Sequence, residues 1–171
     1  IGPGLGLDAW GQGLLDAALA AGKPMVVDAD ALTLIAGQAD IGSADWVLTP
    51  HPGEAGRLLG VSAGDIQQDR FAALDSLSAR YGGTVLLKGL GTLVQGDPLD
   101  AGPGRALIRD GNPGRASGGM GEVLTGVIAA LRAQGLNSFD AARFGAMVHA
   151  RAADHCAALQ GERGLLATDL L

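Results

Sequence analysis

The sequence predicts an α/β fold in which a mostly parallel sheet carries helices on both faces. Short apolar runs alternate with longer segments of helical periodicity, which is typical of parallel sheets covered on both sides. Hydrophobic residues make up 47% of the 171-residue chain and charged residues 18%, enough for one packed core. There are 29 glycines, far above an average share of ~7%. We expect them where the backbone turns tightly or approaches a ligand.

The first third of the chain predicts helices and strands in alternation. Short, continuous apolar runs indicate strands buried on both faces, and helical spacing of leucine and alanine indicates helices. Gly22 is a typical helix stop, and Pro52 suits a first helical position because no bond is lost there. In chain order we expect helix 8–21, strand 25–27, helix 31–36, strand 46–48 and helix 52–59.

The remainder predicts three strands between long helices. Two glycines, Gly82 and Gly83, end the first of these helices. Apolar residues at i, i+3, i+4 and i+7 mark the helix that starts near Glu122. In chain order we expect helix 65–81, strand 84–87, two shorter edge strands 92–94 and 106–108 joined by turn 96–104, a glycine-dense loop 110–121, a helix from residue 122, and helix 139–159.

Charge and cysteine content exclude several classes of protein. The net charge is −6, the pI is near 4.8 and no basic run occurs, so we expect no nucleic-acid partner. No apolar stretch approaches the ~18 residues that span a bilayer, so we expect no membrane segment. The single cysteine, Cys156, excludes an internal disulfide framework and a cysteine-based zinc site, and a reducing cytoplasm is the expected setting.

The beginning of the chain predicts a missing segment. The first residue is Ile1 rather than methionine, and a glycine-rich turn, Gly2 to Gly6, follows at once. Such a turn normally follows a strand. We therefore expect a single domain over residues 1–171 that lacks its N-terminal part.

Polar residues follow every predicted strand. They occupy residues 28–30, 49–54, 88–92 and 109–110. Because ligands of open α/β sheets bind at the carboxyl ends of the strands, this shared edge is the expected site.

The loop from Gly111 to Gly121 is the strongest candidate for an anion site. Bare glycine amides followed by the positive end of a helix are suited to phosphate. The loop matches neither the Walker A pattern nor the dinucleotide fingerprint. The alternative is that its glycines only permit close packing of helix on sheet. Glu122, just after it, has two interpretations: a carboxylate that takes a proton from a substrate hydroxyl, or a complement to the helix dipole worth ~0.3–1 kcal/mol.

Other polar residues also have two interpretations each. His51, fixed between two prolines, suits either a substrate contact or a rigid surface turn. Lys88 suits either a phosphate contact or a solvent-exposed strand end. Asp28 and Asp30 suit Mg²⁺, but we favour helix capping by one of them. A structural role is favoured for the three residues of the last helix, His149, His155 and Cys156.

Six segments in order resemble one known family. They are Gly2-Pro3-Gly4-Leu5-Gly6, residues 27–32 (VDADAL), residues 48–54 (LTPHPGE), Lys88-Gly89-x-x-Thr92, residues 112–121 (NPGRASGGMG) and residues 164–170 (GLLATDL). Together they resemble the ADP-dependent NAD(P)H-hydrate dehydratase family, the C-terminal half of the bifunctional bacterial nicotinamide-nucleotide repair enzyme. The resemblance runs from end to end of the chain.

This resemblance implies a three-layer ribokinase-like fold and a repair reaction. Hydrated NADH or NADPH is phosphorylated on its hydroxyl by ADP, or by ATP in some members, and loses phosphate to regain the reduced nicotinamide. Mg²⁺ is expected with the nucleotide, although no ligand set is evident. An N-terminal epimerase domain in the parent chain and a homo-oligomer are also implied. By resemblance the hydrate is contacted by Gly4, His51 and Glu122, and the nucleotide by Lys88, Gly89, Leu90, Gly91, Thr92, Asn112, Gly118, Gly119 and Gly121.

Two residues depart from the family pattern. Glu122 stands where the family has Asp as the general base, and Thr33 replaces a usual Asn. The added methylene moves the carboxylate by about 1 Å, a displacement that can cost ~100-fold in rate. Two alternatives stay open: a ribokinase-like kinase of a small alcohol of the hydroxyethylthiazole type, and a nucleotide-binding module without catalysis.

Overall fold

A five-stranded sheet forms the centre of the computed structural model, which describes residues 1–38, 41–97, 104–112 and 117–171. The strands lie in chain order, with β1 to β3 parallel and β4 and β5 antiparallel to their neighbours. The expected α/β class is confirmed, and the sheet is mixed because β4 alone runs opposite to the other strands. The strands are β1 (Met25–Val27), β2 (Trp46–Leu48), β3 (Thr84–Leu87), β4 (Thr92–Gly96) and β5 (Gly104–Ile108).

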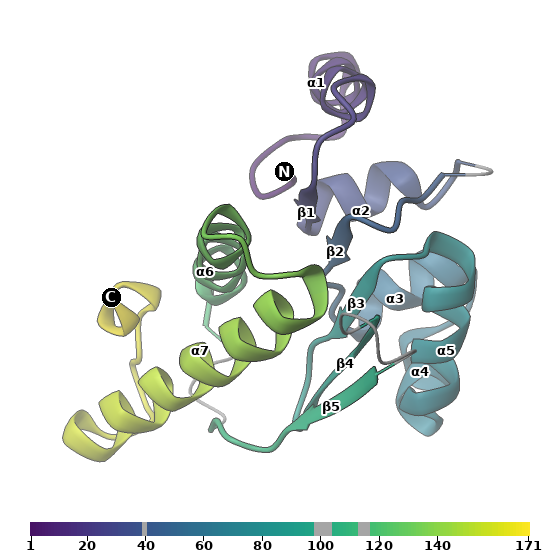
Figure 1. Cartoon of the computed structure of the whole chain (residues 1–171). Coiled ribbons are helices and arrows are strands. Elements are labelled where there is room, and N and C mark those ends of the chain that lie inside the picture. Colours follow the sequence, from purple (N-terminus) through teal and green to yellow (C-terminus); the bar gives the residue numbers. More distant parts are fainter. Residues whose placement is uncertain (39–40, 98–103, 113–116) are drawn as a thin grey trace.

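Helices cover both faces of the sheet. Helices α6 and α7 lie on one face and α2 to α5 on the other, with α1 beyond β1 (Figure 1). Within the described ranges none of the helices is long and apolar enough to cross a bilayer. The helices are α1 (Ala9–Ala20), α2 (Ala29–Ile35), α3 (Pro52–Leu59), α4 (Ala63–Gln68), α5 (Arg70–Tyr81), α6 (Met120–Ala133), α7 (Ser138–Gln160) and the 3₁₀ helix η2 (Ala167–Leu170).

Strands β1 to β4 contribute to two separate cores. Successive side chains of a strand point to opposite faces, so Val26 packs with α6 and α7 whereas Val27 packs with the helices of the other face. Leu86 and Leu87 divide in the same way. This three-layer arrangement leaves the carboxyl ends of the strands as the place where loops from both faces meet.

The single helix expected over residues 65–81 is wrong. Two helices, α4 and α5, meet at Asp69, whose backbone leaves the helical region (φ −142°, ψ 85°). The Asp69 side chain accepts a hydrogen bond from the Ala72 amide at 2.9 Å, so it caps a new helix. The apolar spacing runs across this break, which is why periodicity alone missed it. Arg70 is thereby placed at the first position of α5.

Candidate active site

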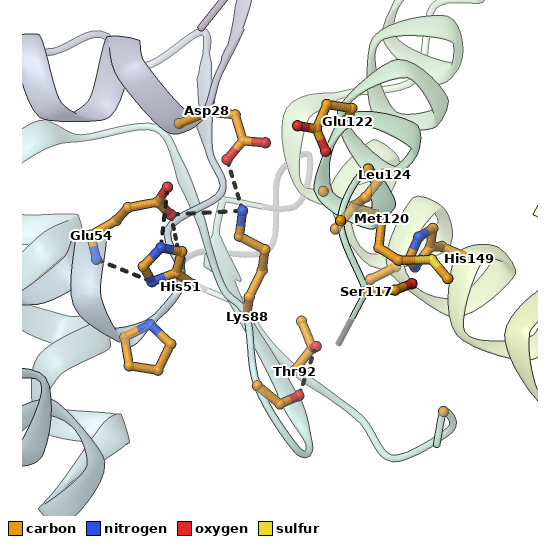
Figure 2. Close-up of a pocket in the computed structure, with 18 of the residues that line it drawn as sticks. Asp28, His51, Glu54, Lys88, Thr92, Ser117, Met120, Glu122, Leu124 and His149 are labelled. Atoms are coloured by element: carbon orange, nitrogen blue, oxygen red, sulfur yellow. Dashed lines mark hydrogen bonds and ion pairs between the residues drawn. The ribbon is translucent and has the colours of Figure 1, made fainter. Parts of the chain in front are cut away.

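A cavity of about 850 Å³ lies at the carboxyl ends of the strands. Its walls come from the turn before α3, the turn between β3 and β4, the segment leading into α6, and α7 (Figure 2). All the site residues expected from the sequence line it except Gly4 and Gly91. Residues 113–116 of the expected anion loop lie outside the described residues. The lining therefore includes His51, Lys88, Gly89, Leu90, Thr92, Asn112, Gly118, Gly119, Gly121 and Glu122.

A partly buried ion pair lines this cavity. The Lys88 ammonium lies 2.8 Å from Asp28 Oδ1 and 3.7 Å from Glu54 Oε2. The Thr125 hydroxyl donates to Asp28 Oδ2 at 2.8 Å, so both oxygens of this carboxylate, which is only 2% exposed, have partners. Lys88 is not a solvent-exposed strand end, because its side chain is 20% exposed and the neighbouring carboxylates hold its charge at the cavity.

Helix capping by Asp28 or Asp30 is a wrong expectation. Asp28 precedes α2 but makes no side-chain cap bond, because its carboxylate is bound to Lys88 and Thr125. Asp30 accepts a hydrogen bond from the Gly6 amide at 2.8 Å and so anchors the N-terminal glycine turn. Both carboxylates make long-range contacts in place of local ones.

His51 is fixed by a reciprocal cap at the start of α3. Its Nδ1 accepts from the Gly53 amide at 2.9 Å and the Glu54 amide at 3.3 Å. The Glu54 carboxylate in turn accepts from the His51 amide at 2.7 Å. Because an accepting Nδ1 carries no proton, the neutral ring holds its proton on Nε2. The imidazole is thus held at the cavity edge in one tautomer, with Glu54 as a partner that the sequence analysis missed.

The start of α6 lines the cavity with a glycine-rich turn. The first amides of a helix have no intrahelical acceptor and carry its positive end. Gly119 precedes α6 in the left-handed region, with φ +87°. A Cβ on Gly121 would lie 3.5 Å from Lys88 Nζ, so this turn lies beside the ion pair. Figure 2 shows the exposed Glu122 carboxylate turned toward the side that carries Asp28 and Lys88.

Two charged residues that sequence reasoning missed hold the cavity turns from behind. Asp154 of α7 accepts from the Gly111 amide at 2.7 Å and from Asn112 Nδ2 at 2.8 Å. Arg70 of α5 donates to four backbone carbonyls of the turn after β3. No local pattern identifies either residue, because each acts on backbone groups far away in the sequence.

The far wall of the cavity is largely apolar. Met120 and Leu124 of α6 line it beside His149 of α7, which is 6% exposed. Cys156 donates its thiol proton to the Asp169 carbonyl at 3.0 Å, which ties α7 to η2, while His155 is exposed. Of the three residues of the last helix, His149 is the one that lines the cavity.

Comparison with known proteins gives a consistent result. A family model described as NAD(P)H-hydrate dehydratase matches residues 1–171. The bifunctional NAD(P)H-hydrate repair enzyme of Coxiella burnetii is 48% identical over 99% of this chain, which spans 34% of that relative. The chain is therefore about a third as long as this curated relative.

Solved structures of similar proteins share the fold. The ADP/ATP-dependent NAD(P)H-hydrate dehydratase of Bacillus subtilis, co-crystallised with ATP and Mg²⁺, aligns with a TM-score of 0.84 and 29% identity. The alignment covers 99% of this chain and 59% of that one. A ribokinase-like superfamily protein of Enterococcus faecalis aligns with a TM-score of 0.82 and 29% identity, over 99% of this chain and 58% of that one. The ribokinase-like fold expected from the sequence is thus confirmed.

Proposed function

The chain belongs to the NAD(P)H-hydrate dehydratase family, and we propose that it catalyses the ADP-dependent dehydration of NADH and NADPH hydrates to the reduced cofactors. One observation carries the proposal: the glycine-rich start of α6 lines one cavity together with Glu122. Anionic phosphate and a proton acceptor would then meet at the hydroxyl of the hydrate. His51 is proposed to contact the hydrate at the opposite edge.

The proposed reaction has two steps. Glu122 takes the proton of the hydrate hydroxyl. At the same time the hydroxyl oxygen bonds to the terminal phosphorus of ADP, and the bond between that phosphorus and AMP breaks. The lone pair of the ring nitrogen then expels phosphate as the carbon–oxygen bond breaks, and the neighbouring ring carbon loses a proton to water, which forms the double bond of the dihydronicotinamide. The amides of Gly119 and Gly121 would stabilise charge on the transferring phosphoryl group.

Magnesium is proposed to arrive on the nucleotide. Within the described ranges no three His, Cys, Asp or Glu residues lie close enough together to hold a metal ion. Asp28 is already bound to Lys88 and Thr125, which leaves Glu122 as the exposed carboxylate near the amides. Mg²⁺ commonly binds through substrate phosphates with few protein ligands, so these residues fit a nucleotide-borne ion.

The decisive experiment follows the return of absorbance at 340 nm from NADPH hydrate with ADP or ATP and Mg²⁺. We expect recovery with the wild-type chain and a loss of about 100- to 10,000-fold in kcat for Glu122→Gln, which cannot accept the proton. Glu122→Asp, the matched control, keeps the carboxylate and is expected to stay within about tenfold of wild type. A phosphorylated small alcohol without NADPH recovery supports the kinase alternative, and ADP binding without turnover supports the non-catalytic module.

The setting of the protein is part of the proposal. We propose a cytoplasmic homo-oligomer whose parent chain carries an N-terminal epimerase domain, in line with relatives that are called bifunctional. Light scattering of the purified protein tests the oligomer, since a monomer mass contradicts it.

A further inference from the structure

The guanidinium of Arg70 lies inside the turn that connects β3 to β4. Its Nη1 donates to the carbonyls of Leu90 at 2.7 Å and Gly91 at 2.9 Å. Its Nη2 donates to those of Leu87 at 3.2 Å and Lys88 at 3.4 Å. Burial lowers the pKa of Arg70 from its ordinary value, yet an arginine keeps its charge at neutral pH. One side chain therefore fixes the direction of four consecutive or nearly consecutive carbonyls.

The amides of this turn must point the other way. In a trans peptide the N–H and C=O bonds are antiparallel, so a carbonyl turned toward Arg70 turns the next amide outward. Lys88 follows this rule, because its amide leaves the guanidinium and donates to the Pro50 carbonyl at 2.8 Å. The same reasoning turns the amides of Gly89 and Gly91 away from Arg70. Gly89 is the one of these two that lines the cavity.

The turn is built to admit the guanidinium. Gly89 has φ +150°, and a Cβ there would lie 2.9 Å from Arg70 Nη2. The Leu90 side chain is 86% exposed, so its own packing does not hold the turn in shape. The break at Asp69 places Arg70 at the start of α5, and the Asp69 cap fixes that position. Arg70 therefore holds the backbone of this wall, together with the Thr92 hydroxyl, which donates to the Gly89 carbonyl at 3.3 Å.

We propose that Arg70 is a positioning residue of the nucleotide site, which holds the turn so that the Gly89 amide donates to an acceptor atom of the adenine nucleotide. This inference rests on the proposed function, because it assigns the cavity wall at residues 88–92 to ADP. Arg70 acts through the backbone and is not itself expected to touch the nucleotide. Its loss should thus weaken nucleotide binding without changing the proton transfer at Glu122.

The test compares Arg70→Ala and Arg70→Lys with Arg105→Ala in the whole chain. Arg105 is a matched control because it is half-exposed, pairs with Asp75 and does not line the cavity. For Arg70→Ala we expect the Kd and KM for ADP to rise by about 10- to 100-fold, with kcat and the KM for the hydrate within about threefold. Free guanidinium at low millimolar concentration should restore part of the affinity, and lysine should restore little because one ammonium cannot span four carbonyls.

The outcomes separate this inference from the proposed function. If the Kd of Arg70→Ala for ADP stays within about twofold of the wild-type value, the inference is overturned and the proposed function is not. The inference is also overturned if Arg70→Ala impairs every kinetic constant equally, lowers the melting temperature and is not rescued by guanidinium. Those results would indicate a merely structural role. A wild-type chain that does not bind ADP overturns both.

Discussion

Two walls of the cavity are held by opposite charges. The turn after β3 surrounds Arg70, which donates to its carbonyls, whereas the segment before α6 is held by Asp154, which accepts from the Gly111 amide. We call Arg70 and Asp154 the clamps of these two walls. They come from helices on different faces of the sheet, α5 and α7 respectively (Figure 1). Both walls are rich in glycine, and glycine backbone loses more conformational entropy on ordering than any other residue. Each wall therefore depends on a remote charged side chain for its shape.

The sign of each clamp determines what the wall offers a ligand. Because the Arg70 guanidinium binds the carbonyls of the turn after β3, the amides of that turn point outward. They can therefore donate to an anion or to a ring acceptor. The Asp154 carboxylate, which accepts from Gly111 and Asn112, anchors the segment before α6. The amides that can donate to a ligand lie further along the chain, at the start of α6. Loss of a clamp should thus affect nucleotide binding, while a change at the α6 amides should affect catalysis as well.

Among changes to these two walls, the largest effect is expected at Gly119, whose backbone is proposed to hold the transferring phosphoryl group. Gly119→Ala places a side chain at φ +87°, and its Cβ would lie 2.9 Å from that of Ala167. The start of α6 must shift, and we expect kcat/KM to fall by about 100-fold or more because the amides leave the phosphoryl group. Gly126→Ala, in open space on the same helix, is the control. NADPH recovery at 340 nm measures both, and equal rates for the two variants contradict this role of the α6 amides.

An intermediate effect is expected at Asp154. Asp154→Asn keeps the size of the side chain but replaces one acceptor with an NH₂ group, which then faces either the Gly111 amide or the Asn112 amide group. A buried donor left unsatisfied costs about 1–3 kcal/mol, so we expect the Kd for ADP to rise by about tenfold. Calorimetric titration measures this effect.

Asp110→Asn is the control for Asp154 because Asp110 pairs only loosely, at 3.9 Å, with the exposed Arg151. We expect no change in its Kd for ADP, since exposed ion pairs contribute little. If Asp154→Asn binds ADP as tightly as Asp110→Asn does, the segment before α6 does not depend on Asp154 for its shape.

The sequence predicted the elements of both walls but not their clamps. The strands 25–27, 46–48 and 84–87 and the helix 52–59 have the expected bounds, because continuous apolar runs and Pro52 are local signals. The ends of parallel strands meet at one edge, so most of the expected site residues also gather in one cavity.

The clamps could not be predicted because their partners are distant in the chain. Asp154 is 43 residues from Gly111, and Thr125 is 97 residues from Asp28. No spacing rule relates a carboxylate to a backbone amide at such separations. The same reason explains the wrong expectation for Asp28, which a local rule assigned to a helix cap although Lys88, 60 residues away, binds it.

The smallest expected effect separates the position of Arg70 from its charge. Asp69→Ala removes the cap of α5, whose bond to the Ala72 amide is 2.9 Å long, and should lower the free energy of unfolding by about 1 kcal/mol. Ser62→Ala is a matched control, because Ser62 caps α4 through the Asp65 amide at 3.1 Å and has no contact with Arg70. We expect a similar loss of stability from both changes in urea unfolding. Only Asp69→Ala changes the start of α5, where Arg70 lies. It alone should therefore raise the KM for ADP, by about two- to fivefold, which is less than the rise expected for Arg70→Ala. If the two cap variants change the KM for ADP equally, the shape of the turn after β3 does not depend on where α5 begins, and the clamp acts through the charge of Arg70 alone.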